Sequence, residues 1–181
     1  MEKFVVDFSL TTLKRVEQMA SNNGLRKPVV AFSGGKDSIV LFYLTMIAGV
    51  NFDFKMVNTT VEMKGTLENV RRNYPLVEII QPLYSMKELI LKKGFLPTSL
   101  KRYCCSYLKE NSIDADVILT GVRRAESPKR SHRSVFQLKE GRNFVDFDNS
   151  FEASNYLSTC WKGKERLIVN PIAHWTNNDI A

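Results

Sequence analysis

Cysteine, histidine and long apolar runs are scarce in this chain. Its 181 residues include three cysteines, two of them adjacent at Cys104 and Cys105, and two histidines. The cysteines make a poor disulfide framework, because neighbouring cysteines rarely reach bridging geometry and one cysteine is left over, so metal or redox chemistry is the better role for them. No stretch approaches the roughly 20 uninterrupted apolar residues of a membrane helix. We therefore expect a cytoplasmic protein with no membrane partner.

The composition is that of a folded domain. Apolar residues make up 44% and charged residues 25%, a balance typical of globular proteins. Because no linker, repeat or low-complexity tract is found, we expect a single domain over residues 1–181. Lys and Arg outnumber Asp and Glu by 26 to 19, giving a net charge of +7. This charge favours anionic partners such as nucleotides, sulfate esters or nucleic acid, and a generally basic surface is the competing interpretation.

Short apolar runs alternate with amphipathic segments along the chain. We expect strands at 28–32, 52–58, 77–80, 116–120 and 167–172, a hairpin at 134–138 and 143–147, and helices from Ser9, at 36–48, at 66–73 and from Ser85. The alternation predicts an α/β fold with a doubly wound, mostly parallel sheet and helices on both faces. In such folds ligands bind at the carboxyl ends of the strands. A helix cap at Thr176 followed by the end at Ala181 leaves a truncated C-terminus open.

One glycine-rich loop lies between the strand at 28–32 and the helix at 36–48. Its residues are Ser33-Gly34-Gly35-Lys36-Asp37-Ser38. Adjacent glycines let backbone amides approach an anion, and the helix N-terminus adds the positive end of its dipole. Lys36 and the serine hydroxyls add donors, each contributing about 1.5–3 kcal/mol with a charged phosphate. Asp37 would repel phosphates unless Mg²⁺ lies between, so the loop predicts a magnesium–nucleotide site.

A basic cluster directly follows the strand at 116–120. Its members are Arg123, Arg124, Lys129, Arg130 and Arg133, set against the single carboxylate Glu126. Arginine forks suit sulfate and phosphate oxygens better than lysine does, and Glu126 would orient an arginine or cap a turn. A run of charges is more often a solvated loop, but its position at a strand end favours an anion site.

Five segments, in order, resemble the phosphoadenosine phosphosulfate (PAPS) reductase family of the adenine-nucleotide α-hydrolase superfamily. They are the loop at 33–38, Asn58-Thr59-Thr60-Val61-Glu62, Arg102-Tyr103-Cys104-Cys105 with Lys109, Gly121-Val122-Arg123-Arg124-Ala125-Glu126-Ser127 with Arg130, and Asn170-Pro171-Ile172 with Trp175-Thr176 and Asp179-Ile180. Together they span residues 29–180. The second segment departs from the family's Asp-Thr-Gly-x-Glu pattern at Asn58 and Thr60.

The resemblance implies a sheet of the adenine-nucleotide α-hydrolase type and a substrate that is ATP, adenylyl sulfate or PAPS. Residues 33–38 would cradle the phosphates, and Asp37 would orient Mg²⁺. Arg123, Arg124 and Arg130 would bind the sulfate or distal phosphate, and Gly121, Glu126 and Ser127 complete the nucleotide-binding set. We expect Lys36, Asp37 and Arg124 to be the catalytic residues.

The resemblance also gives the cysteines a role. In relatives the paired cysteines contribute to a 4Fe-4S cluster completed by a Cys-x-x-Cys pair, which this chain lacks. Cys104, Cys105 and Cys160 supply at most three ligands where a cluster normally has four, so a complete cluster is expected only in a longer parent chain. Buried packing is the competing interpretation. The nearby cations Lys101, Arg102 and Lys109 would favour thiolates.

The remaining aromatic residues and histidines are expected to be structural. Phe136 and Phe144 should lie in the hairpin core, and Trp175 should pack near the nucleotide. His132 and His174 share no metal-ligand spacing with the cysteines. We expect them to be polar residues of loops and strand ends.

Two reactions compete for the site. Family reductases tend to lose the loop lysine and aspartate, so the retained Lys36 and Asp37 favour ATP pyrophosphatase or adenylyl-transfer chemistry in sulfur metabolism or thiolation. The alternative is reduction of PAPS or adenylyl sulfate, although the cysteine-bearing C-terminal tail of family reductases is absent here. A third interpretation is a nucleic-acid-modification subunit whose loop at 123–133 meets DNA or RNA phosphates. The sulfur acceptor and a homo-oligomeric state are left open.

Overall fold

The structure, a computed structural model, describes residues 3–98, 100–101, 103–105, 107–108, 112–141, 143–161, 163 and 165–180, without the side chain of Lys129. It comprises two compact units. Unit 1 contains Met1–Ala31, Gly35–Asp53 and Ala115–Ala181, and unit 2 contains Phe32–Gly34 and Phe54–Asp114. Within the described ranges, no helix combines the length and apolarity needed to cross a bilayer.

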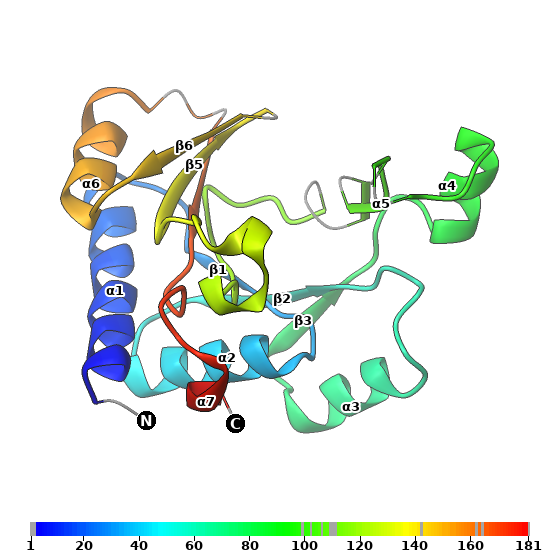
Figure 1. Cartoon of the computed structure of the whole chain (residues 1–181), viewed down its shortest axis with the longest axis horizontal. Helices are drawn as coiled ribbons and strands as arrows, with labels where there is room; N and C mark the ends of the chain where they lie inside the picture. Colours follow the sequence, from blue (N-terminus) through cyan, green and yellow to red (C-terminus); the bar gives the residue numbers. More distant parts are fainter. Residues whose placement is uncertain are drawn as a thin grey trace. The chain divides into compact units, whose positions relative to one another are not determined.

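The strands of unit 1 form a mixed sheet (Figure 1). Their order across it is β1 (Val29–Ala31), β4 (Val117–Leu119), β7 (Arg166–Val169), β5 (Phe136–Glu140) and β6 (Asn143–Phe147). The first three are parallel, whereas β5 runs antiparallel to both β7 and β6. Leu119 pairs with Val30 on one side and Val169 on the other, and all three are fully buried. These apolar, β-branched-rich strands are typical of a sheet covered on both faces.

The helices of unit 1 pack on this sheet and on one another. They are α1 (Lys3–Asn22), α2 (Lys36–Ala48), α6 (Ser150–Thr159) and α7 (Asn177–Ile180), with 3₁₀ turns η2 (Arg124–Glu126) and η3 (Pro128–Arg130). The first helix contacts α2 and α6, and α6 also contacts β5 and β6. The Asn149 side chain accepts hydrogen bonds from the amides of Phe151 and Glu152 and so caps α6.

Unit 2 is built on two parallel strands. These are β2 (Asp53–Val57) and β3 (Val77–Ile80), accompanied by α3 (Thr66–Asn73), α4 (Met86–Lys93) and α5 (Tyr103–Cys105). Its core includes Met56, Val70 and Leu89, which are buried. The expected capping box is confirmed: Ser85 accepts from the Glu88 amide, and the Glu88 carboxylate accepts from the Ser85 amide.

Parallel strands joined through helices, with an antiparallel hairpin added, confirm the predicted doubly wound α/β class. Two local predictions are wrong. The first helix begins at Lys3 rather than Ser9, because buried Ser9 lies inside it and donates its hydroxyl to Pro171 O at 2.8 Å while accepting from Trp175 Nε1 at 2.9 Å. Phe144 is 44% exposed and therefore not core, whereas Phe136 and Trp175 are buried as predicted.

Candidate functional site

The N-terminus of α2 is shaped by the glycine-rich loop. Gly35 occupies the N-cap position in extended conformation, and no side chain caps the helix there. Ser38 is buried, and its hydroxyl donates to the Gly35 carbonyl at 2.7 Å. A glycine cap leaves no side chain between the first helical turn and an incoming group. The arrangement is typical of helix N-termini that receive anions.

Gly121 brings the end of β4 against this helix terminus. A Cβ at Gly121 would lie 3.0 Å from the carbonyl carbon and oxygen of Asp37 and 3.2 Å from the Ser38 amide nitrogen. Those atoms belong to the backbone of a helix and cannot move aside cheaply. Glycine is therefore required at this position for the close approach of the two segments.

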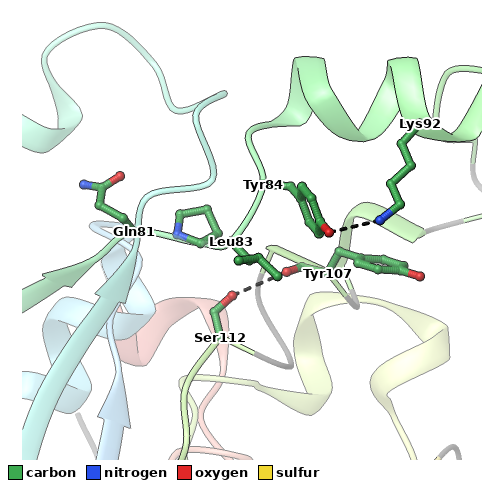
Figure 2. A pocket seen from close by; sticks show the side chains of 7 residues that line it. Gln81, Leu83, Tyr84, Lys92, Tyr107 and Ser112 are labelled. Atoms are coloured by element: carbon green, nitrogen blue, oxygen red, sulfur yellow. Dashed lines mark hydrogen bonds between the residues drawn. The ribbon is translucent and has the colours of Figure 1, made fainter.

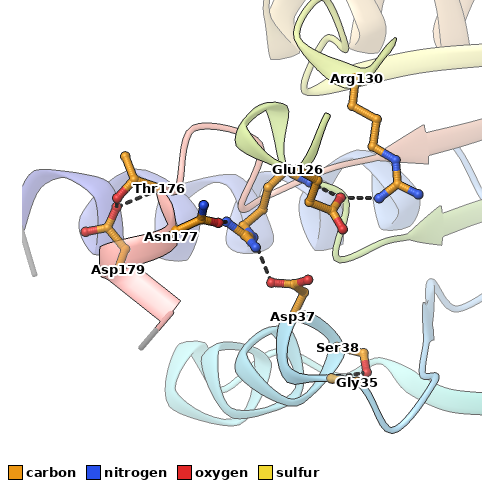
Figure 3. Close-up of polar contacts among 9 residues, drawn as sticks. Gly35, Asp37, Ser38, Glu126, Arg130, Thr176, Asn177 and Asp179 are labelled. Carbon is orange, nitrogen blue, oxygen red and sulfur yellow. Dashed lines mark hydrogen bonds and ion pairs between the residues drawn. The ribbon is translucent and has the colours of Figure 1, made fainter. Parts of the chain in front are cut away.

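Arg123 is the most buried charged side chain of the site. Only 2% of it is exposed; its Nε donates to Asp37 Oδ1 at 2.7 Å and its Nη1 donates to Asn177 Oδ1 at 3.0 Å (Figure 3). The contacts join the segment after β4 to the first turn of α2 and to α7. Asp37 keeps 19% of its side chain exposed, and its Oδ2 makes no hydrogen bond within the described residues.

Arg124 is oriented by the protein on two sides. Its Nε donates to the Arg133 carbonyl at 2.8 Å, and its Nη1 lies 3.4 Å from His174 Nδ1. Burial and, to a smaller extent, the Arg124 charge hold the pKa of His174 below its usual value. A neutral ring can accept the arginine hydrogen bond at Nδ1, which fits this direction of shift.

Glu126 ties the 3₁₀ turns together. Its carboxylate accepts from the Arg123 amide at 3.1 Å and pairs with Arg130 Nη1 (Figure 3). Burial raises the pKa of Glu126, but the hydrogen bonds from Arg123 and Arg130 and their charges outweigh it, so the pKa lies below its usual value. Ser127 is half-buried and extended between the two turns. The side chain of Lys129 lies outside the described residues.

Lys36 differs from these arginines. It is the first residue of α2, is exposed, and makes no hydrogen bond or ion pair with any residue that the structure describes. Lys36 therefore contributes a charge at the helix terminus that forms no ion pair with a described carboxylate.

The buried side-chain amides of Asn170 and Gln137 form hydrogen bonds that hold the basic loop in place. Asn170 accepts from the Thr120 hydroxyl at 2.6 Å and donates to the Ser134 carbonyl at 2.9 Å. Gln137 accepts from Arg133 Nη1 at 3.0 Å and donates to Asp146 at 2.6 Å. Sequence reasoning did not identify Gln137 or Asn177 as partners of the arginines. Asn177 is distant from Arg123 in the sequence, and Gln137 lies on β5, where a separation of four residues from Arg133 predicts no contact.

Unit 2 holds the other end of the glycine-rich loop and the segment after β2. Gly34 has φ +73°, and a Cβ there would meet Thr66 Cγ2 at 3.3 Å; Ser33 is exposed. Thr59 donates through its amide and hydroxyl to Glu62 Oε1 at 2.7 and 2.6 Å. Thr60 has φ +64°, which is unusual for a β-branched residue, and its hydroxyl accepts from the Met86 amide at 2.9 Å. The family's glycine at this position suits the same backbone conformation.

None of the three cysteines forms a disulfide. Cys104 and Cys105 are half-buried in α5 of unit 2, and Cys160 is exposed at the end of α6 in unit 1. Among the described residues, no group of three or more His, Cys, Asp or Glu side chains is arranged to hold a metal. Arg102 and Lys109, expected to act on the thiols, lie outside the described residues. Cluster ligation stays a prediction.

Comparison with known proteins assigns the chain to a family. The family model of the phosphoadenosine phosphosulfate reductase domain matches residues 27–181, so the chain belongs to this family, within the adenine-nucleotide α-hydrolase superfamily. It is 33% identical over 135 residues to an uncharacterised protein of Methanocaldococcus jannaschii, covering 64% of this chain and 28% of that protein. It is also 26% identical over 137 residues to adenylyl cyclase-associated protein 1 of mouse and human, covering 69% of this chain and 26% of theirs.

The chain thus spans between a quarter and a third of the length of these relatives. Membership of the family supports a nucleotide-binding α/β domain of the kind found in enzymes. The reaction, the nucleotide and the roles of the site residues are matters of proposal.

Proposed function

We propose that this domain binds ATP with Mg²⁺ at the N-terminus of α2 and supports attack at the α-phosphate with release of pyrophosphate. The observation that carries the proposal is Lys36, an exposed cation beside the glycine cap of α2 that has no partner among the residues the structure describes. Family membership supplies the nucleotide class. In the reaction, an acceptor nucleophile forms a bond to the α-phosphorus while the bond to the pyrophosphate leaving group breaks.

Lys36 and the helix terminus supply the phosphate-binding charge. The dipole of a helix contributes about 0.3–1 kcal/mol for an anion at its N-terminus, and a charged hydrogen bond contributes about 1.5–3 kcal/mol. Of these two contributions, that of Lys36 is therefore expected to be the larger. Its exposure lets the ammonium follow the phosphate oxygens as negative charge moves onto the leaving pyrophosphate.

Asp37 fits a role as a magnesium ligand through one oxygen. Arg123 occupies Oδ1, whereas Oδ2 has no partner within the described residues. Mg²⁺ is commonly held by one or two carboxylates together with substrate phosphates and waters. When bound, Mg²⁺ would neutralise phosphate charge and stabilise the leaving pyrophosphate. Arg123 fixes the direction of the carboxylate.

Arg124 and Arg130 are our candidates for direct contact with the distal phosphate or a sulfate. Each keeps guanidinium donors beyond its internal contacts: Arg124 uses Nε and Nη1, and Arg130 uses Nη1. For Arg123, which we also expected to contact the anion, near-complete burial favours a positioning role instead. Gly121 and Ser127 complete the segment that holds these side chains.

The test is calorimetric titration of the protein with Mg-ATP, PAPS and adenylyl sulfate, together with an assay of pyrophosphate release. Lys36→Ala should weaken Mg-ATP binding roughly 10- to 150-fold, the equivalent of one charged hydrogen bond. Lys14→Ala is the matched control, because Lys14 is an exposed lysine on α1. Binding of PAPS or adenylyl sulfate with no binding of Mg-ATP would instead assign the site to sulfonucleotide reduction.

A further inference from the structure

A pocket lies in unit 2, at the carboxyl end of β3. It has a volume of about 430 Å³ and is lined by Gln81, Pro82, Leu83, Tyr84, Lys92, Tyr107 and Ser112. Figure 2 shows side chains from three segments, the stretch after β3, α4 and the residues after α5, facing this space. The volume falls within the range of small-molecule sites, roughly 300–1,000 Å³.

A lysine ammonium lies over each of two tyrosine rings of the pocket. Lys92 Nζ lies 4.4 Å from the centroid of the Tyr84 ring and donates to its hydroxyl at 3.0 Å (Figure 2). Lys93 Nζ lies 4.8 Å from the centroid of the Tyr107 ring and donates to its hydroxyl at 3.3 Å. The hydrogen bond that Lys92 donates to Tyr84 raises the pKa of Lys92, which keeps this ammonium charged. Flat rings and positive charge are therefore combined in one place.

The segment that forms the pocket is strongly basic. Residues 81–112 contain six lysines and arginines but only two glutamates. Of these glutamates, Glu88 accepts hydrogen bonds from Ser85 in the capping box of α4. Positive charge in this segment therefore exceeds what its own carboxylates neutralise, which favours a polyanionic partner.

Apolar surface adjoins the charges. Leu83, a residue of the pocket, is 85% exposed, and Leu91 on α4 is also largely exposed. Stacking rings, exposed apolar side chains and lysines together match the groups that single-stranded nucleic acid offers, which are unstacked bases and regularly spaced phosphates. A duplex keeps its base faces covered, and an acidic peptide has no flat ring for each charge.

We propose that this pocket binds an unpaired nucleotide of a single-stranded nucleic acid. The base packs against Tyr84 or Tyr107 and Leu83, and the flanking phosphates meet Lys92 and Lys93. The pocket shares no lining residue with the terminus of α2, and its existence does not depend on the reaction proposed there. Unstacked bases and regularly spaced phosphates are common to single-stranded RNA and DNA.

The test is fluorescence anisotropy of the whole chain with labelled 12-nucleotide single-stranded RNA and DNA of mixed sequence. Tyr84→Ala and Tyr107→Ala should each weaken binding roughly 5- to 150-fold, the effect of losing one stacked base. Lys92→Gln should weaken binding and lower the slope of log affinity against log salt by about 0.7. Tyr43→Ala and Lys14→Gln, at exposed positions of α2 and α1, are the matched controls and should change neither quantity.

Circular dichroism checks that each variant folds. Should Tyr84→Ala unfold, Tyr84→Phe and Lys92→Gln replace it, with the phenylalanine variant expected to retain most of the affinity because the ring remains. The proposal is overturned by equal binding of a duplex, by equal competition from polyglutamate, by mononucleotides that bind as tightly as the oligonucleotide, or by pocket variants that behave like the controls. Loss of Mg-ATP binding in Lys36→Ala leaves oligonucleotide binding unchanged, which separates this test from that of the proposed function.

Discussion

Replacing Arg123 by alanine should destabilise the protein more than removal of any other arginine for which the structure gives an ion pair. The guanidinium is 2% exposed and holds Asp37 at 2.7 Å and Asn177 at 3.0 Å. Breaking a fully buried ion pair costs about 3–5 kcal/mol, because the remaining charge is left without a partner. Asp37 is 19% exposed, so water relieves part of this cost. We expect a loss of about 2–4 kcal/mol.

The assay is urea unfolding followed by circular dichroism, with a thermal melt alongside. For a chain of this size the loss corresponds to a fall in Tm of about 4–16 °C. Arg26→Ala is the matched control, since Arg26 pairs with Asp116 at a similar distance, 2.8 Å, while its side chain is 53% exposed. An exposed pair contributes about 0–1 kcal/mol.

A double variant separates the ion pair from the packing of the arginine. Arg123→Ala together with Asp37→Ala should be less destabilised than the sum of the two single variants, because no unpaired charge remains. Equal effects of Arg123→Ala and Arg26→Ala, or strict additivity in the double variant, would refute the reasoning that burial makes the Arg123 contact strong.

Three further predictions concern backbone geometry and protonation. Gly121→Ala should cost about 1–3 kcal/mol in urea unfolding, because its Cβ would lie 3.0 Å from backbone atoms of Asp37. Thr60→Gly should be more stable than Thr60→Ala by about 0.5–1 kcal/mol, since both lose the hydroxyl but only glycine adopts φ +64° without strain. NMR titration should place the pKa of His174 below its usual value, and Arg124→Gln should raise it only in part, because burial is the larger cause. In the interval between the folded and unfolded pKa values the unfolded chain binds more protons, so stability should rise with pH there.

Elements with strong local signals were predictable from the sequence. The helix at 66–73 and the strand at 77–80 are observed with the predicted bounds, and Ser85 caps α4 as its spacing indicates. The helix α6 was missed although Asn149 followed three residues later by Glu152 is a capping signal. The helix has few apolar residues and directly follows a strong hairpin pattern, so its helical periodicity was not recognised.

Predictions failed where a distant partner decides the outcome. Ser9 resembles a helix cap, yet it lies within α1 because its hydroxyl finds Pro171 and Trp175, more than 160 residues away in the sequence. In the same way, the sequence showed the basic loop as a run of charges. It did not show that Arg123 is buried while Arg124 and Arg130 keep part of their surface exposed. The burial of Arg123 depends on Asp37 and Asn177, which only the folded chain brings to it.

The basic side chains differ in how firmly the protein holds them, and this difference affects how the site would bind an anion. Arg124 and Arg130 are held by the Arg133 carbonyl and by Glu126 before any ligand arrives. Ordering a long side chain during binding costs about 0.5–1.5 kcal/mol, and these contacts place that cost in folding instead. Lys36 has no such contact among the described residues, so its ordering must accompany binding. The arginines would therefore set the geometry that an anion must match, while Lys36 would adapt to the phosphates.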